Sequence, residues 1–261
     1  MSTDEPELIQ DLCDNTLWLT FNRPASRNAL TFGMYEALAD VCANVPTDGS
    51  VKAIVISGAG GKAFAAGTDM TQFRAFQTAQ DALDYEAQIE AVLDAVERCK
   101  LPTIAAIHGA CTGGGASIAA VCDLRIASAG LKFGFPIART LGNCLAAGNL
   151  ARLTALIGAG RVREMIFTAR LMLADEALAT GLVSEVLPDE NALLTRATEL
   201  AAQVGAMAPL TLRATKEAMR RNRAAVQVDD EDLIAMCYMS DDFRTGMEAF
   251  LNKTKPDWTG K

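Results

Sequence analysis

The pattern of apolar and polar residues alternates between two periods along the first two thirds of the chain. Short apolar runs predict buried strands, and apolar positions three or four residues apart predict helices between them. The helix predicted over residues 81–99 is the clearest, because its apolar residues from Leu83 to Val96 fall on one side. The predicted strands are 16–22, 51–58, 103–109, 123–128, 131–135 and 182–187, and the predicted helices before residue 191 are 30–45, 81–99, 113–121, 151–157, 161–168 and 174–180.

The pattern from Asn191 to the end of the chain predicts helices alone, including 209–221 and 241–254. Strands that alternate with helices, followed by a helical segment, predict an α/β fold with a C-terminal helical region. We place the boundary between the α/β core, residues 1–195, and the helical region, residues 196–261, inside this last part.

Composition narrows the class of protein. The length of 261 residues suits one large domain, or a domain with a smaller appendage. A formal net charge of −8 argues against a nucleic-acid partner, and we see no cluster of Lys and Arg in the sequence that would favour one. Glycines and charges interrupt the most apolar stretch, residues 103–128, so we predict no membrane span. The polar, acidic first ten residues resemble neither a secretory signal nor a transit peptide, and we expect a cytoplasmic protein.

Cysteine and histidine usage argues against a metal centre. The seven cysteines are scattered, odd in number and free of CxxC pairs, which is typical of reduced thiols. His108 is the only histidine, so a histidine-rich metal site is excluded. We expect the His108 ring to be held at a strand end and predict no bound metal.

Two familiar glycine motifs can be considered and set aside. Gly58 and Gly60 follow a predicted strand, with Asp81 about 20 residues on, which matches a loose dinucleotide-binding pattern. Gly67 would interrupt the helix that this motif needs. A phosphate loop also fails, because no Ser or Thr follows Lys62.

The glycine-bearing turns at 57–70 and 109–117 are better explained together. Both follow predicted buried strands, and Gly114 lies at a predicted helix N-terminus, where free backbone N–H groups favour negative charge. Two such donors on one carbonyl oxygen form an oxyanion hole, worth roughly 3–4 kcal/mol per donor in acyl chemistry. A Cβ would keep a carbonyl from the amide, so Gly113–Gly115 indicates close approach to the backbone.

Five ordered segments resemble the crotonase superfamily, the enoyl-CoA hydratase/isomerase group, over about residues 11–260. The resemblance implies a spiral of ββα units with C-terminal helices that assemble as a homotrimer or a dimer of trimers. It also implies acyl-CoA thioester substrates and enolate-type intermediates, with coenzyme A as part of the substrate and no separate cofactor. The segments are NRPASRNAL (22–30), KAFAAGTDM (62–70), IAAIHGACTGGGASIAAVCDLRIAS (104–128), FGFP (133–136) and AFLNKTKPDWTG (249–260).

The same resemblance implies roles for particular residues. The oxyanion donors would be the backbone N–H groups of Thr68 and Gly114. Without the resemblance, Phe250 would be a core residue, and Arg27 and Lys253 would be solvated charges. The implied CoA contacts are Ala65, Ala66 and Asp69 on the adenine side, Arg27 near the pantetheine and phosphates, and Phe250 and Lys253 from a neighbouring subunit.

The chain departs from the family pattern at two positions. Hydratases of this family add water with two glutamates, and Ser117 and Ile137 stand at those positions here. Neither side chain exchanges a proton at neutral pH, and each general acid or base typically contributes about 10²–10⁴-fold. We therefore do not expect two-glutamate hydration, and the isomerase route through the second glutamate is also undercut.

Three interpretations remain open. In the first, the protein is a lyase or isomerase, Ser117 either packs in its helix or orients a substrate hydroxyl or water, and another group transfers the proton. In the second, the chain binds acyl-CoA without turning it over. In the third, it is an interaction protein that has lost the pocket, which the retained GTD and GGG motifs disfavour. The candidates for proton transfer are Asp69, Arg139, Asn143, Cys144 and Tyr238.

Overall fold

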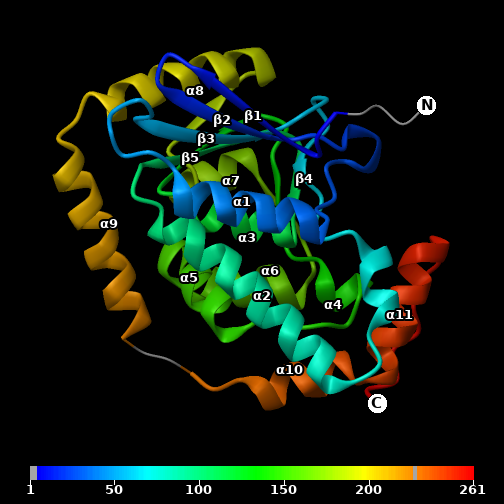
Figure 1. Ribbon diagram of the computed structural model, residues 1–261. Helices are drawn as coiled ribbons and strands as arrows, with labels where there is room; N and C mark the ends of the chain where they lie inside the picture. The colour runs from blue at the N-terminus through cyan, green and yellow to red at the C-terminus, as the bar shows by residue number, and fades with distance from the viewer. Residues whose placement is uncertain (1–4, 226–227) are drawn as a thin grey trace.

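The fold is built on two sheets that share a spiral path, as a computed structural model of residues 5–225 and 228–261 shows (Figure 1). The larger sheet has the order β1-β2-β3-β5-β7-β10; β1 pairs antiparallel with β2, and every other pairing is parallel. Its strands are β1 (Leu8–Cys13), β2 (Thr16–Phe21), β3 (Ala53–Gly58), β5 (Thr103–Ile107), β7 (Leu124–Ser128) and β10 (Glu185–Leu187). The smaller sheet, in the order β4-β6-β8-β9, contains β4 (Ala63–Ala65), β6 (Ala110–Thr112), β8 (Lys132–Gly134) and β9 (Met172–Leu173).

The chain repeats one unit three times. A strand of the larger sheet is followed by a strand of the smaller sheet and then by a helix, in β3-β4-α2, β5-β6-α3 and β7-β8-α4. The predicted spiral of ββα units with C-terminal helices is therefore confirmed. The helices are α1 (Phe32–Asn44), α2 (Ala79–Arg98), α3 (Gly114–Val121), α4 (Ile137–Thr140), α5 (Ala147–Ile157), α6 (Ala159–Phe167), α7 (Ala174–Ala179), α8 (Glu190–Gly205), α9 (Pro209–Ala224), α10 (Glu231–Tyr238) and α11 (Asp241–Asn252), with short 3₁₀ helices η1 (Pro24–Ser26) and η2 (Met70–Ala75).

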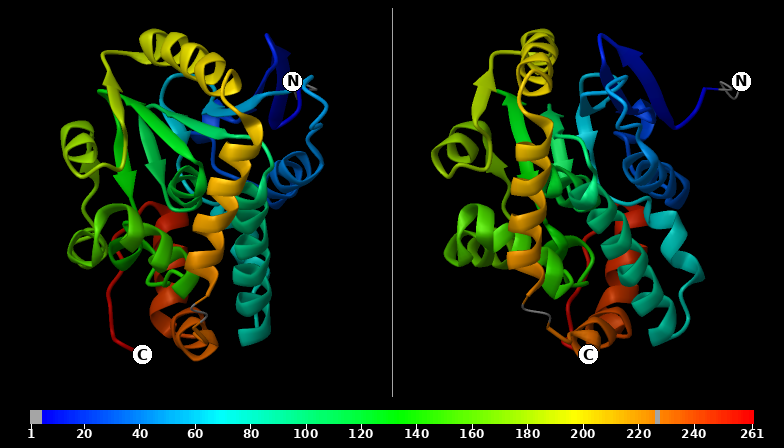
Figure 2. Two further views of the ribbon diagram at one scale, coloured as in Figure 1. Left: turned by 90° about the vertical axis from the view of Figure 1, so that its left-hand side faces the viewer. Right: turned by 60° about the vertical axis from the view of Figure 1, so that its left-hand side comes forward.

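Apolar side chains cover both faces of the parallel strands. Along β3, Ile54 and Ile56 join the main core, while Val55 points to the opposite face and packs in a second cluster with residues of α8. Such strands are apolar on both faces, which explains why 51–58 and 103–109 read as continuous apolar runs. Helix α8 lies across the outer face of the larger sheet (Figure 2).

The boundary expected between residues 195 and 196 is wrong in position. Helix α8 runs without interruption from Glu190 to Gly205. Leu193 and Leu200, on either side of the expected boundary, belong to one cluster on the sheet. The helix cannot be divided without exposing this cluster, so the sheet-bearing part of the chain extends to the end of α8. The role of the later helices in trimerisation stays a prediction.

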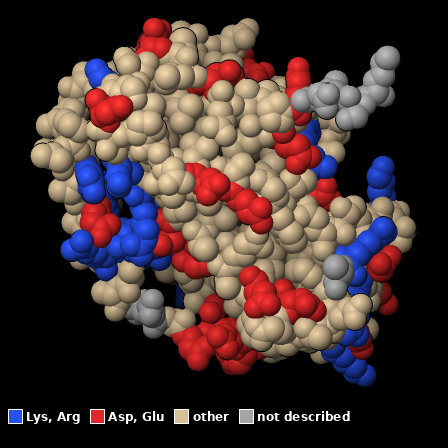
Figure 3. Space-filling model, in the orientation of Figure 1, with Lys and Arg blue, Asp and Glu red and all other residues tan. Residues whose placement is uncertain are grey.

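Helix α9 runs beside α2 and has no buried residue (Figures 1 and 2). Lys and Arg side chains gather on the surface where α9 lies (Figure 3), so the expectation that the chain has no cluster of Lys and Arg is wrong. Much of this charge is paired within the molecule: Lys216 Nζ lies 2.6 Å from Asp123, and Arg223 pairs with Glu97 of α2.

No helix within the described ranges is both long enough and apolar enough to cross a membrane.

Candidate functional site

The turn after β4 leaves the amide of Thr68 free. Thr68 forms an isolated parallel bridge with Leu30, in which the Leu30 N–H donates to the Gly67 carbonyl and the Asp69 N–H donates to the Leu30 carbonyl, both at 2.8 Å. The N–H of Thr68 therefore points to the opposite side of this chain segment. Gly67 makes the turn possible, because its φ of +107° is a conformation that L side chains rarely adopt.

The second turn leaves the amide of Gly114 free. Gly113 has φ of +52° and donates its N–H to the Gly134 carbonyl at 3.1 Å, and α3 begins at the next residue. The first amides of a helix have no intrahelical acceptor. Among the described residues, neither Thr68 nor Gly114 donates its backbone N–H to a protein group.

The two turns are in contact. A Cβ placed on Gly113 would lie 3.3 Å from the Cα of Gly67, and a Cβ on Gly114 would lie 3.2 Å from the Thr68 hydroxyl oxygen. The fold thus brings together Thr68 and Gly114, the two residues whose amides the resemblance implies as oxyanion donors, although they are 46 positions apart in the chain.

The protein's own atoms come closest to the last two glycines of the triplet. A Cβ on Gly114 would lie 1.8 Å from the hydroxyl oxygen of Tyr35, and a Cβ on Gly115 would lie 2.4 Å from the carbonyl oxygen of Ala65. Real Cβ atoms essentially never approach that closely. Glycine is therefore required here by packing, and access of a substrate carbonyl to the amides stays a prediction.

Two tyrosines hold the side chain of Thr68. Its hydroxyl oxygen lies 2.9 Å from the hydroxyl of Tyr35 on α1 and 3.0 Å from the hydroxyl of Tyr85 on α2. Burial raises the pKa of both phenols, so they remain protonated at neutral pH. This chain of hydroxyl groups fixes the turn that presents the Thr68 amide. Sequence reasoning missed it because tyrosines on an amphipathic helix look like ordinary packing residues.

Two buried side chains, Ser117 and Ile137, stand at the positions that the resemblance assigns to hydratase glutamates. Ser117 is buried in α3, donates its hydroxyl to the Gly113 carbonyl at 3.3 Å and accepts the side-chain amide of Asn149 at 2.7 Å. These contacts favour the packing role of Ser117. Ile137 begins α4 and is buried.

A carboxyl group that the sequence analysis did not single out lies close by. Glu86 of α2 accepts a 2.6 Å hydrogen bond from the hydroxyl of Tyr238, which in turn accepts one of 3.2 Å from the side-chain amide of Asn143. Burial raises the pKa of Glu86 to about 7; the Tyr238 hydrogen bond opposes this, and the charges of Asp230 and Glu90 add to it. Two of the predicted proton-transfer candidates are thus connected to this carboxylate, Tyr238 directly and Asn143 through Tyr238.

Asp69 is held differently. Its carboxylate accepts hydrogen bonds from the backbone N–H and hydroxyl of Thr71 and pairs with Arg23 at 2.9 Å. Desolvation by itself would raise the pKa of Asp69. The hydrogen bonds from Thr71 and the charge of Arg23 outweigh desolvation and lower this pKa. Asp69 is therefore an ionised residue that caps η2, and not a group poised to exchange protons.

The remaining candidates lie in three separate segments of the chain: the turn after β4, the end of η1, and the segment between α4 and α5. Ala65 is buried at the end of β4, and the Ala66 N–H donates to the Arg27 carbonyl at 3.1 Å. Arg27 is exposed and has φ of +52°. Cys144 contacts the Leu233 carbonyl at 3.8 Å through its sulfur and lies in the segment between α4 and α5.

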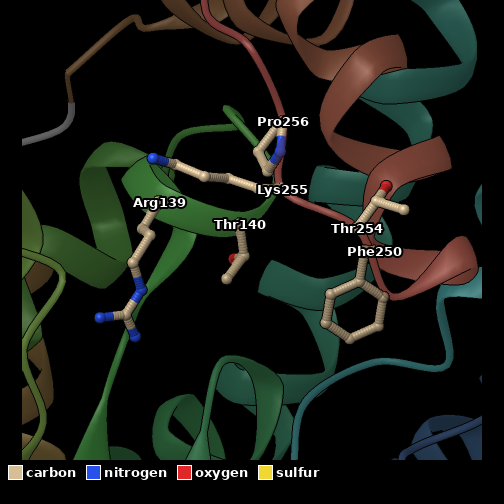
Figure 4. Close-up of a pocket in the computed structure, with 6 residues that line it drawn as sticks. All are labelled: Arg139, Thr140, Phe250, Thr254, Lys255 and Pro256. Carbon is tan, nitrogen blue, oxygen red and sulfur yellow. The ribbon is translucent and has the colours of Figure 1, made fainter.

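Helix α11 carries the predicted C-terminal pair. Phe250 is 49% exposed, so its alternative interpretation as a core residue is wrong, and Lys253 is exposed at the end of the helix. Phe250 lines a surface pocket of about 250 Å³ between α4 and the segment after α11 (Figure 4). The other residues that line this pocket are Arg139, Thr140, Thr254, Lys255 and Pro256.

His108 follows β5 directly, as predicted, and its ring is buried 3.8 Å from Glu190. Burial lowers the pKa of His108, which favours the neutral ring. In the part of the chain that the structure describes, no three His, Cys, Asp or Glu residues are grouped so that they could hold a metal ion.

Comparisons with known proteins agree along nearly the whole chain. The chain is 33% identical over 244 residues to the short-chain-enoyl-CoA hydratase of Clostridium acetobutylicum, with 91% of each chain covered. It is 33% identical over 237 residues to the mitochondrial Delta(3,5)-Delta(2,4)-dienoyl-CoA isomerase of Homo sapiens, covering 87% of this chain and 72% of that protein.

A solved structure of methylmalonyl-CoA decarboxylase in complex with 2-nitronate-propionyl-CoA superposes with a TM-score of 0.86. Its sequence is 25% identical, and the match covers 98% of this chain and 99% of that one. The sequence pattern described as "Enoyl-CoA hydratase/isomerase" matches residues 14–261. This chain therefore belongs to the enoyl-CoA hydratase/isomerase family.

Proposed function

We propose that this protein is an enzyme that binds an acyl-CoA thioester and polarises its carbonyl between the backbone amides of Thr68 and Gly114. One observation supports this above all: two turns that touch each other leave one free N–H each. Donors fixed in advance where negative charge develops stabilise it without reorganisation, worth roughly 3–4 kcal/mol per donor. The charge would develop on the thioester oxygen when the acyl chain becomes an enolate.

The CoA portion would lie along the main chain of Ala65, Ala66 and Asp69, with Arg27 near the phosphates. Phe250 and Lys253 would reach the CoA of a neighbouring subunit in a homotrimer or a dimer of trimers. The exposure of both residues on α11 supports this placement, because a large aromatic side chain at the surface is available to a ligand or a second subunit.

The reaction we propose is that of a lyase or isomerase on a CoA ester, and two-glutamate hydration is not part of it. The known relatives include a hydratase, an isomerase and a decarboxylase of CoA esters, so the family supports several outcomes from one scaffold. At the positions of the two hydratase glutamates this chain has Ser117, which is bonded to Gly113 and Asn149, and Ile137.

A panel of malonyl-, enoyl-, oxo- and aryl-CoA esters tests this function. We expect CoA esters to bind more tightly than the corresponding free acids, measured by calorimetry, and at least one ester to yield a product detectable by mass spectrometry. Crotonyl-CoA should lose its enoyl absorbance at least about 10²-fold more slowly than with a two-glutamate relative.

Three results would contradict the proposal. Equal affinity for esters and free acids would show that the protein has no site for the CoA portion. Rapid hydration of crotonyl-CoA would show that other residues do the work of the two hydratase glutamates. Tight binding without any product would instead favour the non-catalytic acyl-CoA-binding protein.

A further inference from the structure

Helix α2 connects the predicted oxyanion donors to the segment that follows α4. Its neighbouring residues Tyr85 and Glu86 reach in two directions, Tyr85 to the Thr68 hydroxyl and Glu86 to the hydroxyl of Tyr238. Tyr238 ends α10, which lies against the N-terminal half of α2 (Figure 1), and it also contacts Asn143, three residues after α4. Helix α2 thus links the turn that carries the Thr68 amide, through Tyr85, to Tyr238 and Asn143, through Glu86.

One oxygen of this carboxylate is free. Glu86 Oε1 accepts the hydrogen bond from Tyr238. Within residues 5–225 and 228–261, Oε2 has no hydrogen-bond partner. This oxygen is also not fully enclosed by protein atoms. Glu86 also makes no ion pair with any described Lys or Arg. A carboxylate that is held at one oxygen and open at the other can receive a proton from a bound molecule.

Tyr238, the hydrogen-bond donor to Glu86, packs among aromatic rings. Its ring centroid lies 4.8 Å from that of Phe243 and 6.3 Å from that of Tyr85. Such a site is poorly solvating, and it disfavours the charged carboxylate. The titratable groups that face Glu86 are Tyr35 from α1, Tyr85 and Glu90 from α2, Cys144 after α4, Asp230 before α10, and Tyr238.

These contacts point to a role that the family pattern does not supply. We propose that Glu86 transfers protons to and from the acyl chain of the bound CoA ester, with Tyr238 and Asn143 as positioning residues. The proposal rests on the proposed function, because the proton becomes removable only when the thioester carbonyl is polarised. Its substrates are acyl-CoA esters that carry a hydrogen on the carbon next to the carbonyl.

The step balances without any further reactant. The Glu86 carboxylate takes a proton from that α-carbon, the C–H electron pair forms the C=C bond of the enolate, and the carbonyl π pair moves to the oxygen. Glu86, now a neutral acid, then returns a proton. On Glu86, whose Oε2 is not fully enclosed, the proton exchanges with solvent, so return to the α-carbon introduces a solvent hydrogen. Return to the γ-carbon of a β,γ-unsaturated chain moves the double bond into conjugation.

Hydrogen exchange separates this role from binding. Butanoyl-CoA in D₂O, followed by NMR, should lose its α-hydrogen signal with the full-length protein. The Glu86→Gln variant should exchange at least about 10²-fold more slowly, with the dissociation constant of butanoyl-CoA unchanged within about twofold. Asp84→Asn is the matched control, because Asp84 is an exposed carboxylate on the same helix and bonds to Gln80.

The pH profile tests the positioning residue. Exchange needs the carboxylate form, so the wild-type rate should rise with pH through about 7, where the pKa of Glu86 lies. The Tyr238 hydrogen bond stabilises the carboxylate, and Tyr238→Phe should therefore move this rise to higher pH. A purely structural role for Tyr238 would lower the rate without moving the profile.

The outcomes distinguish the two proposals. A wild-type protein that binds butanoyl-CoA without exchange would overturn the enolate function, and the role of Glu86 with it. Normal exchange in Glu86→Gln would overturn the role of Glu86 alone. If Glu86→Gln fails to fold, the variants Glu86→Asp and Tyr238→Phe test the role of Glu86 instead. The proposal would be overturned if both variants showed the same pH profile of exchange as the wild type.

Discussion

Removing a single backbone N–H at Gly114 is the most direct perturbation of the proposed oxyanion hole. Proline has no N–H and is well tolerated at the first position of a helix, where Gly114 lies. Any Cβ at this position would meet the Tyr35 hydroxyl oxygen at 1.8 Å, so the change must be made together with Tyr35→Phe. The nearest remaining atoms would then be the ring carbon that bore the hydroxyl, at 3.1 Å, and the Thr68 hydroxyl oxygen, at 3.2 Å.

The matched control is Gly114→Ala in the same Tyr35→Phe background. Both double variants carry the added Cβ and lack the Tyr35–Thr68 hydrogen bond, so they differ chiefly in the N–H and the proline ring. Loss of one oxyanion donor costs roughly 3–4 kcal/mol in the transition state. This corresponds to a rate about 10²–10³-fold lower for the proline variant than for the alanine variant.

The assay is the α-hydrogen exchange of butanoyl-CoA, read beside the melting temperature and the dissociation constant of the ester. We expect the two variants to melt within a few degrees of each other and to differ mainly in exchange rate. Equal exchange rates in two folded variants, both close to the wild-type rate, would refute the role of the Gly114 amide. A difference confined to ester binding would refute the claim that this donor acts mainly on the charged oxygen.

Three further outcomes are expected. Ser117→Ala should lower the free energy of unfolding by about 1–3 kcal/mol in urea titrations, because it leaves the buried Asn149 amide without its partner, and an unchanged midpoint would contradict this contact. Arg152→Leu should cost about 3–5 kcal/mol in the same assay, since it leaves two glutamates of α2 without their buried cation; a midpoint near that of the wild type would contradict this. The folded-state pKa of Glu86 is raised from 4.5 to about 7, so the native state binds more protons and its stability should fall as pH rises from about 4.5 to 7. Glu86→Gln should lose this part of the pH dependence in thermal melts at a series of pH values, and identical curves for the two proteins would contradict it.

Most long elements could be predicted from the sequence because each has a strong local period. The strand predicted at 51–58 is β3 (Ala53–Gly58), and the helix predicted at 81–99 is α2 (Ala79–Arg98). The short strands β4 and β6 were not predicted, because three residues show no period. They exist because each pairs with neighbours in the smaller sheet.

The same division applies to the candidate site. Gly67 and the glycine triplet were visible in the sequence, because a residue without a Cβ marks a special backbone position wherever it occurs. Glu86 was not, because an acidic residue on an amphipathic helix looks like part of a solvated face. What made it a candidate is the packing of α10 against α2, which places Tyr238 on its carboxylate across 152 residues of chain.

The sequence by itself indicated an α/β fold with a C-terminal helical region, the family by resemblance, and two glycine-bearing turns. These features depend on local periodicity, on glycine and on motif order, all of which can be read along one dimension. The tertiary structure alone decided which side chains surround those turns and how charged they are. Contact between α1, α2 and α10 and the loss of water around a carboxylate depend on residues distant in the chain, and no local pattern encodes them.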